Sequence, residues 1–445
     1  MRRGLSFLVA TMVFAAPVAG RAQEKKEEAK PATSTVTVYG TFNVNTQWTR
    51  SIGATQGVTG ITTATTARDI SPRLAVSTDS SNVGVKAALP FAPWGKMVAQ
   101  CETSANVDGI SVSGICNRNS QLGVSGVFGT LFLGNWDTPF KSVWYGTKVD
   151  DPFGNTDVFD RAALMGVAPF NVKSSTWKAA TGDVISGFNL RAQNSIAYWT
   201  PAYYGLSAKV QYGANEFKNN VGDISPKLWS ANVVYDNGPL SVVGAYENHE
   251  WGYGLNGFNA GAAAPLPATA TFGSTAANST TAHTEDYAWR VGAGYELKTD
   301  LGATTPNFVF EQVKFMQPRA PTGAIKDYNH YAWSASLKHR YQNHELRGRY
   351  DRANAGGCTR QGGGACSTDG YGSDMITAGY AYYFAPTAQV YLTWTQIRND
   401  RLAQYSFATA GASAIAGGGS AGNPRGTVLP GQDPQALALG LRYAF

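Results

Sequence analysis

The residue types that most often carry out catalysis are few and scattered in this chain. Gly418-Gly419-Ser420-Ala421-Gly422 matches the G-x-S-x-G pattern of a nucleophilic serine, but it lies in an Ala/Gly-rich stretch. The strand-to-helix turn that this motif needs is missing from the pattern around it. The histidines show no metal-ligand spacing, and they are His249, His283, His330, His339 and His344. We therefore expect no enzymatic activity, no metal and no cofactor.

The N-terminus has the three parts of a secretory signal peptide. A positively charged start precedes a short apolar run over 5–16, and small residues lead to a cleavage site after Ala22. The apolar run is too short to span a bilayer as a helix, which disfavours the alternative of an N-terminal anchor. We expect residues 1–22 to be a signal peptide and 23–34 to be a short periplasmic leader.

The cysteines fall into two close pairs, Cys101 with Cys116 and Cys358 with Cys366. In an exported chain such pairs indicate two local disulfides, each of which closes one loop. A metal site made by all the cysteines is the alternative. It would need both pairs to converge, and the C-x₂-C spacing typical of such sites is absent.

Large apolar and polar residues alternate from Thr35 to the last residue. In the C-terminal stretch Leu437, Leu439, Leu441, Tyr443 and Phe445 point one way, and small or polar residues point the other. A strand with two such faces separates lipid from water in a transmembrane barrel. Turn residues divide the chain into sixteen predicted strands, the first from Thr35 and the others at about 72–90, 96–104, 118–126, 130–137, 191–200, 206–217, 227–236, 240–250, 285–297, 306–316, 329–342, 345–354, 373–384, 388–399 and 434–445.

Short turns and long loops alternate between these strands, as in outer-membrane barrels. The long loops cover about 138–190, 251–284 and 400–433, and aromatic residues at strand ends, such as Trp199 and Tyr443, suit the membrane interface. Closure of an even number of strands leaves no backbone group unpaired in lipid. The sequence therefore predicts that 35–445 form an all-β, antiparallel, 16-stranded transmembrane barrel. A lumen of this width is too large for side chains to fill, so we expect it to hold water.

The composition supports a membrane barrel over a soluble domain. Only 15% of the residues are charged, whereas soluble domains carry about 25%. The formal net charge is +6, and removal of Arg2, Arg3 and Arg21 with the signal peptide leaves 6 − 3 = +3. No basic tract points to nucleic acid as a partner.

Several short motifs, in their order and spacing, resemble those of the Gram-negative general diffusion porins, most closely the β-proteobacterial type. They are Thr35-Val36-Thr37-Val38-Tyr39-Gly40, Gln121-Leu122-Gly123-Val124-Ser125-Gly126, Asn194-Ser195-Ile196-Ala197-Tyr198 and the terminal Gly440-Leu441-Arg442-Tyr443-Ala444-Phe445. The resemblance implies an outer-membrane channel for passive diffusion of ions and small hydrophilic solutes. It implies a homotrimer surrounded by lipid and lipopolysaccharide, and a terminal Phe445 that the barrel-assembly machinery reads. A solute-selective channel of the same fold is the first alternative, and a barrel enzyme or adhesin is the second.

The resemblance further implies that the long third loop, about 138–190, folds into the lumen and narrows it. Acidic loop residues would then face basic residues on the opposite wall, and opposed charges of this kind set ion preference. The acidic set is Asp150, Asp151, Asp157 and Asp160, and the basic set is Lys86, Arg118 and Arg191.

Alternation places Lys86 and Arg191 on the inward face of their strands. Arg118 shares parity with the outward Leu122, so it needs a bulge or lies in the mouth of a loop. Asn82 stands where the family often has its first basic wall residue, which weakens the positive side. From the remaining basic residues and the charge of +3 we expect a weak preference for anions.

Overall fold

The computed structural model describes residues 33–53, 55, 69–109, 114–154, 156, 158–169, 176–177, 187–214, 227–250, 284–319, 322–407, 428 and 430–445. The expected signal peptide, almost all of the expected leader and the G-x-S-x-G match lie outside these residues. Within them, no helix is long and apolar enough to cross a membrane.

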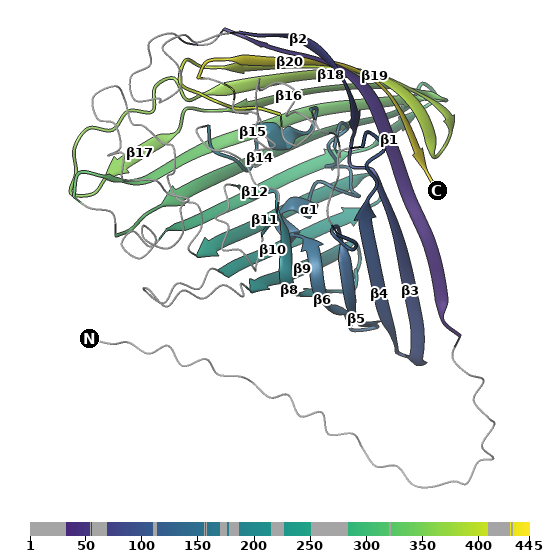
Figure 1. Ribbon diagram of the computed structural model, residues 1–445. Helices are drawn as coiled ribbons and strands as arrows, with labels where there is room; N and C mark the ends of the chain where they lie inside the picture. The colour runs from purple at the N-terminus through teal and green to yellow at the C-terminus, as the bar shows by residue number, and fades with distance from the viewer. Residues whose placement is uncertain are drawn as a thin grey trace, which may run out of the picture.

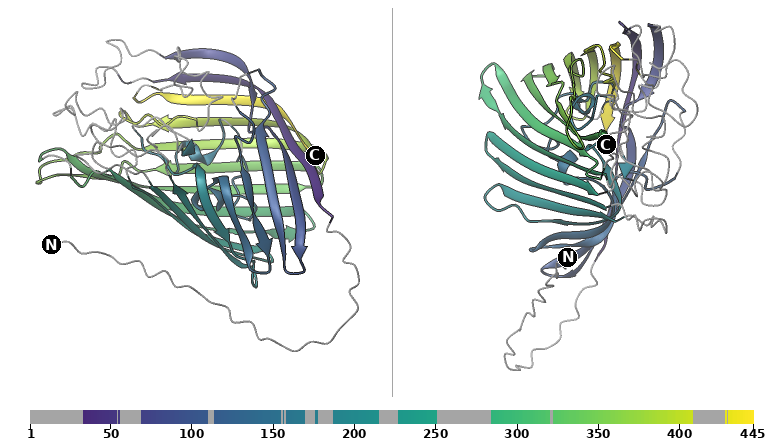
Figure 2. Two further views of the ribbon diagram at one scale, coloured as in Figure 1. Left: turned by 60° about the horizontal axis from the view of Figure 1, so that its bottom comes forward. Right: turned by 90° about the vertical axis from the view of Figure 1, so that its left-hand side faces the viewer.

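The described strands make sixteen antiparallel crossings that close into a barrel (Figures 1 and 2). The ring closes where β1 (Thr35–Ile52) pairs with β20 (Asp433–Ala444). On its other side β1 pairs with β2 (Ile70–Thr78) and β3 (Asn82–Ala92). These two are halves of the single crossing predicted at 72–90, and the chain between them includes Ser80 with a positive φ of 50°.

The other predicted strands are confirmed, with ends that differ by a few residues. They are β4 (Gly95–Ser104), β5 (Ser120–Gly126), β6 (Gly129–Asp137), β8 (Arg191–Trp199), β9 (Leu206–Ala214), β10 (Lys227–Asn237), β11 (Leu240–Glu250), β12 (Glu285–Tyr295), β14 (Gly302–Met316), β15 (Ile325–Tyr341), β16 (His344–Ala353), β18 (Ser373–Ala385) and β19 (Ala388–Asn399). The short strands β13 (Leu297–Thr299) and β17 (Gly357–Arg360) extend the pairing of β14 and β15. The long third loop holds the short helix α1 (Pro139–Ser142), a 3₁₀ turn (Arg161–Ala163) and β7 (Thr176–Trp177).

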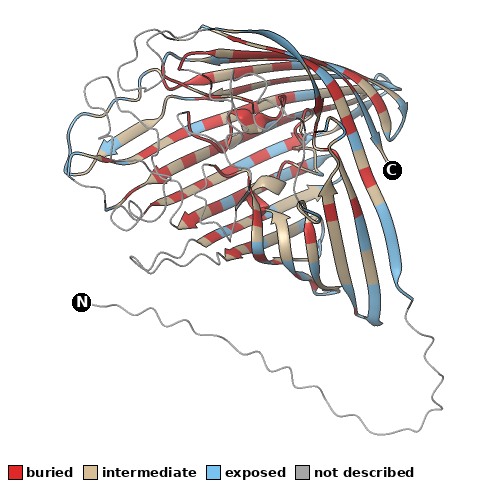
Figure 3. Ribbon diagram, viewed as in Figure 1, coloured by how far each residue is buried: buried red, intermediate tan, exposed pale blue. Residues whose placement is uncertain are grey.

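The crossings carry large apolar residues on their outer face, and many of their inward residues are polar. On β1 the outward Val36 and Val38 are 66% and 61% exposed, whereas the inward Asn43, Asn45 and Gln47 are buried. Figure 3 shows this alternation as bands of buried and exposed residues along the strands. In a membrane, lipid would cover the outward residues, and closure of the ring pairs the backbone groups that an edge would expose.

The closing seam depends on a glycine opposite the last residue. The amide of Gly40 donates to the carbonyl of Phe445 at 3.1 Å, and the amide of Phe445 donates back at 3.0 Å. A Cβ at Gly40 would lie 2.5 Å from the Phe445 ring, so a larger residue would displace the terminal side chain. On the lumen side, the hydroxyl of Tyr391 donates to Asn43 at 2.9 Å across the seam.

Disulfides brace two of the loops. Cys101 is bonded to Cys116 and Cys358 to Cys366, the two pairs that the sequence predicted. Each bond joins residues that are close in sequence, at separations of 15 and 8, so each closes a small loop.

Candidate functional site

The third loop begins with contacts to the inner face of β10. Thr138 caps α1 by accepting the amide of Lys141, and Pro139 occupies the first turn, where no amide is needed. The amide of Phe140 donates to the Ser230 hydroxyl at 2.9 Å, and Asn232 donates to the carbonyl of Pro139 at 2.7 Å. Helix α1 therefore lies against the wall, inside the ring of strands (Figure 1).

Glycines on the inner wall leave room for the next part of the loop. A Cβ at Gly294 would lie 2.1 Å from the carbonyl oxygen of Lys148, and one at Gly292 would lie 2.9 Å from Val149. On β18, a Cβ at Gly379 would lie 2.9 Å from the ring of Phe153. The loop backbone thus approaches β12 more closely than any residue with a side chain would allow.

Buried charges join the loop to β16. Nη1 of Arg349 lies 2.6 Å from an Asp151 carboxylate oxygen, and its Nε lies 2.7 Å from Asp351. The side chains of all three residues are fully buried. The amide of Arg161 donates to the second Asp151 oxygen at 2.8 Å. Asp151 therefore holds the loop to the wall, and it is not free to meet solutes.

A second buried ion pair supports the far part of the loop. Nη2 of Arg290 on β12 lies 2.7 Å from Glu311 on β14, and the other oxygen of Glu311 accepts the amide of Gly166. Arg290 also donates to the carbonyl of Phe140 at 3.1 Å. The described part of the loop is thus fixed along the wall from β10 to β18.

The environment of each described loop aspartate differs. Burial disfavours charge on Asp151, but Arg349 and Arg161 outweigh it and hold its pKa below the ordinary value. Burial raises the pKa of Asp150 to about 6. Burial and the charge of Asp151 raise the pKa of Asp160, which also caps the 3₁₀ turn through the amide of Ala162. The fourth predicted acidic residue, Asp157, lies outside the described residues.

Two of the three predicted basic wall residues join one cluster. Nε of Arg118 lies 2.7 Å from Glu102, and Nη2 of Arg191 lies 3.2 Å from Asp137. Asn119 bridges the second pair, because its side chain accepts from Arg191 at 2.9 Å and donates to Asp137 at 3.1 Å. Arg118 lies near enough for its charge to act on Asp137 as well.

Lys86 stands apart from this cluster. It is exposed, and its ammonium lies 4.3 Å from the centre of the Tyr39 ring. Tyr39 in turn donates to Glu102 at 2.9 Å, which places Lys86 on the same side of the lumen as Arg118.

An irregularity before β5 turns Arg118 into the lumen. The predicted strand at 118–126 starts two residues later, at Ser120, while the amide of Arg118 still donates to the carbonyl of Glu102 at 3.0 Å. The extra residue breaks the alternation, so Arg118 shares the inward face with Gln121 although their parity differs.

The ring order places these groups opposite the loop aspartates. β5 and β6, beside the Arg118 cluster, lie half-way round the ring from β15 and β16, which carry Lys338 and Arg349. No ion pair joins Lys86, Arg118 or Arg191 to a described loop aspartate. The two sets occupy opposite sectors of the lumen.

The sequence interpretation missed the basic residues that hold the loop. β16 carries Glu345, Arg347, Arg349 and Asp351 at every second position, all facing inward. This E-x-R-x-R-x-D pattern is visible in the sequence and could have identified a charged inner wall. Arg290 on β12, which also contacts the loop, and the inward Lys338 on β15 were missed as well.

An aromatic cluster also lies on the inner wall. The ring of Phe132 lies 4.8 Å from that of Trp199 and 5.3 Å from that of Trp136, with Lys209 beside Trp199. Trp199 shares the inward face with the buried Ala197. The prediction that Trp199 lies in the membrane interface is therefore wrong, because its ring faces the lumen.

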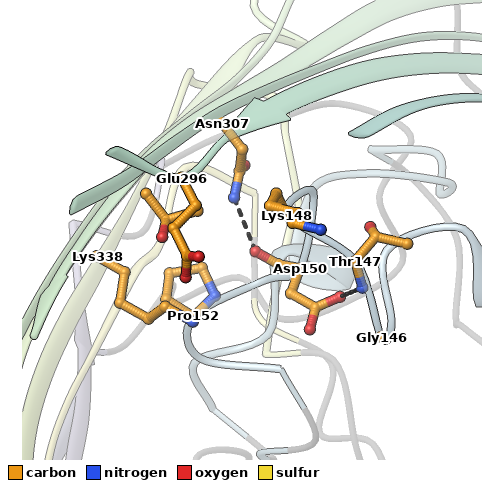
Figure 4. Close-up of a pocket in the computed structure, with 9 residues that line it drawn as sticks. Gly146, Thr147, Lys148, Asp150, Pro152, Glu296, Asn307 and Lys338 are labelled. Carbon is orange, nitrogen blue, oxygen red and sulfur yellow. Dashed lines mark hydrogen bonds between the residues drawn. The ribbon is translucent and has the colours of Figure 1, made fainter. Parts of the chain in front are cut away.

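One cavity of about 280 Å³ lies between the loop and the wall (Figure 4). Thr147, Asp150 and Pro152 line it from the loop, and Glu296, Asn307 and Lys338 line it from the barrel. No group of His, Cys, Asp or Glu side chains suited to a metal ion occurs in the described part of the chain.

A closed β-barrel with an apolar outside and a charged, loop-bearing inside defines a membrane-spanning barrel protein of the channel type. The chain belongs to the Gram-negative porin family, whose model matches residues 8–402. This confirms the resemblance, the all-β barrel and the outer-membrane location that the sequence predicted, and it favours a channel over an enzyme.

The individual proteins that this chain resembles have low sequence identity to it. The major outer membrane protein P.IB of Neisseria meningitidis serogroup B (strain MC58) is 28% identical over 250 residues, which cover 54% of this chain and 59% of that protein. The chain therefore spans less than two thirds of this relative's length. Outer membrane porin protein 32 of Delftia acidovorans is 31% identical over 127 residues, covering 28% of this chain and 32% of that one.

Solved structures share the fold at low identity. An anion-selective porin from Comamonas acidovorans superposes with a TM-score of 0.62 at 18% identity, covering 93% of this chain and all of the other. OmpT of Vibrio cholerae, expressed in the outer membrane, gives 0.56 at 14% identity, covering 94% and 99%.

Proposed function

We propose that this protein forms a water-filled channel in the outer membrane, through which ions and small hydrophilic solutes diffuse passively. One observation carries the proposal, the closed sixteen-stranded ring with an apolar outer face and a polar inner face. Side chains cannot fill a lumen of this width. The described loop lies along β10 to β18, which supports an open passage beside Lys86, Arg118 and Arg191.

We propose that the third loop narrows this passage and that the opposing sector gives it a weak preference for anions. In that sector Arg118, Lys141 and Arg191 share two carboxylates, those of Glu102 and Asp137. With Lys86 the formal excess is 4 − 2 = +2. In the loop sector the wall cations are paired with carboxylates, Arg349 with Asp151 and Asp351, and Arg347 with Glu345. Fixed charge of one sign attracts the opposite ion into a narrow pore.

We also propose a homotrimer in contact with lipid and lipopolysaccharide, assembled by machinery that reads Phe445. The family supports this assembly, and one solved relative, OmpT of Vibrio cholerae, is described as a trimer form. The exposed outward residues of β1, such as Val36, supply an apolar surface that lipid or a second copy would cover.

Liposome swelling tests the channel directly. Vesicles that contain the refolded protein should swell in neutral sugars at rates that fall as the sugar becomes larger. Vesicles with the heat-denatured protein serve as the control. Swelling no faster than in this control would overturn the proposal.

A further inference from the structure

The cavity between the loop and the wall carries groups of both signs that face the same space (Figure 4). Asp150 approaches from the loop, and Lys338 and Glu296 approach from the barrel. These wall residues lie next to the short turns, so the cavity is at the short-turn end of the lumen. Its volume of about 280 Å³ corresponds to roughly nine water molecules at about 30 Å³ each. This space suits a solute of a few heavy atoms.

The cation of the cavity is available to a ligand. Lys338 is half-buried and inward, since its neighbour Leu337 is 49% exposed on the outer face. Within the described residues the Lys338 ammonium makes no ion pair or hydrogen bond, although its charge acts on the nearby Asp150. By contrast, the other lysine of the cavity, Lys148, is neutralised by Asp236 at 2.7 Å. A half-buried ammonium with no hydrogen-bonded partner among the described residues favours an incoming carboxylate.

The anionic side is fixed by the fold. Asp150 accepts the amide of Thr147 at 2.9 Å through one oxygen, and its backbone carbonyl accepts from Asn307 at 2.8 Å. These bonds hold the residue in place and leave the second carboxylate oxygen unused. In the described part of the chain, the carboxylate of Glu296 pairs only with the exposed Lys298, at 2.9 Å. Both carboxylates can therefore accept from an incoming ammonium.

We propose that this cavity is a weak binding site for small zwitterions of the α-amino acid class, which pause there while they cross the lumen. The inference rests on the proposed channel function. Lys338 takes the carboxylate of the solute, and Asp150 and Glu296 take its ammonium. A simple anion would meet two carboxylates and a simple cation would meet Lys338, so each would be bound less well than a molecule that carries both charges.

Alanine and lactamide are the matched probes, because they have the same atoms but only alanine is a zwitterion at pH 7. Uptake into vesicles should saturate for alanine, at concentrations on the order of millimolar, and should stay linear for lactamide. Excess glycine should compete with alanine uptake more strongly than excess lactate or alaninamide, which carry one charge each.

Two variants test the residues. Lys338→Met and Asp150→Asn should each lower the ratio of alanine to lactamide uptake by about two- to fivefold, the effect of one partly exposed charge contact. Lys209→Met, the same change at another inward lysine, should leave the ratio unaltered. Lactamide uptake in each variant reports that the barrel has folded and is open.

The outcomes separate this inference from the channel itself. Equal and linear uptake of both probes by the unmodified protein would overturn the binding site and leave the channel intact. An unchanged ratio in both Lys338→Met and Asp150→Asn would do the same. If neither probe enters, the channel proposal falls and the binding site falls with it.

Discussion

Arg349 of β16 and Asp151 of the third loop form an ion pair at 2.6 Å, with both side chains fully removed from solvent. Asp351 shares the same guanidinium at 2.7 Å. A buried charge without its partner is costly, so the pair constrains the position of the loop even where it adds little net stability. Loop and wall are therefore joined by a specific charge contact as well as by apolar packing.

Replacement of this guanidinium should destabilise the barrel. Arg349→Met leaves Asp151 and Asp351 buried side by side, and we expect a loss of about 3–5 kcal/mol. Urea titration in lipid vesicles, followed by tryptophan fluorescence, measures this loss. Arg352→Met removes the neighbouring, partly exposed pair with Asp374 at 3.5 Å and should cost less than about 1 kcal/mol. Equal effects of the two substitutions would contradict the assigned role of Arg349.

A methyl group at Gly294 should move the loop. Its Cβ would lie 2.1 Å from the carbonyl oxygen of Lys148, so the backbone must shift, at a cost of about 1–3 kcal/mol. Gly294→Ala should therefore change the single-channel conductance. In Gly244→Ala on β11, the new Cβ would meet nothing within 4 Å. A normal conductance in Gly294→Ala would show that the loop does not narrow the passage.

A charge reversal at Lys86 tests the basic sector. Lys86 is exposed and has no carboxylate partner in the described structure, so its full charge acts on the lumen. Lys86→Glu turns one cation of this sector into a carboxylate, so its formal excess falls by two, from +2 to 0. The reversal potential in a salt gradient should then show a shift of ion selectivity toward cations. No movement would place Lys86 outside the conducting path.

The strand pattern predicted most of this fold, because lipid on one side and water on the other impose a strict period of two. Register errors on such strands would expose polar residues to lipid, so the pattern fixes both strand and face. The same rule predicted an inward Lys86, whose ammonium lies 4.3 Å from the centre of the Tyr39 ring.

The rule failed where the backbone departs from regular pairing. Parity left two positions open for Arg118, a bulge or the mouth of a loop, and only the structure shows the irregularity before β5 that brings it to the inner wall. The pairing of Asp151 with Arg349 joins residues 198 positions apart, and only the folded loop reveals it. The aspartates were expected to face the opposite wall, whereas Asp151 is occupied by its own side of the barrel.

Acid should increase the preference for anions. Burial raises the pKa of Asp150 to about 6, so this carboxylate is charged at pH 7.5 and only about a tenth ionised at pH 5. Loss of negative charge from the lumen favours the passage of anions. Protonation of Asp160, whose pKa is also raised, shifts the ion preference in the same direction. The reversal potential, measured at both pH values, should shift toward anions.

Removal of both carboxylates is the control for this shift. In the double variant Asp150→Asn, Asp160→Asn the change between pH 7.5 and pH 5 should shrink, because asparagine also caps a helical turn but does not titrate. A shift of the original size in this variant would assign the pH response to other groups.

The most direct test of the central claim is the conductance of the purified protein in a planar lipid bilayer. A water-filled trimeric channel predicts large current steps that occur in groups of three and grow in proportion to the salt concentration. A protein that inserts, as shown by its resistance to urea extraction, but carries no current would contradict the account.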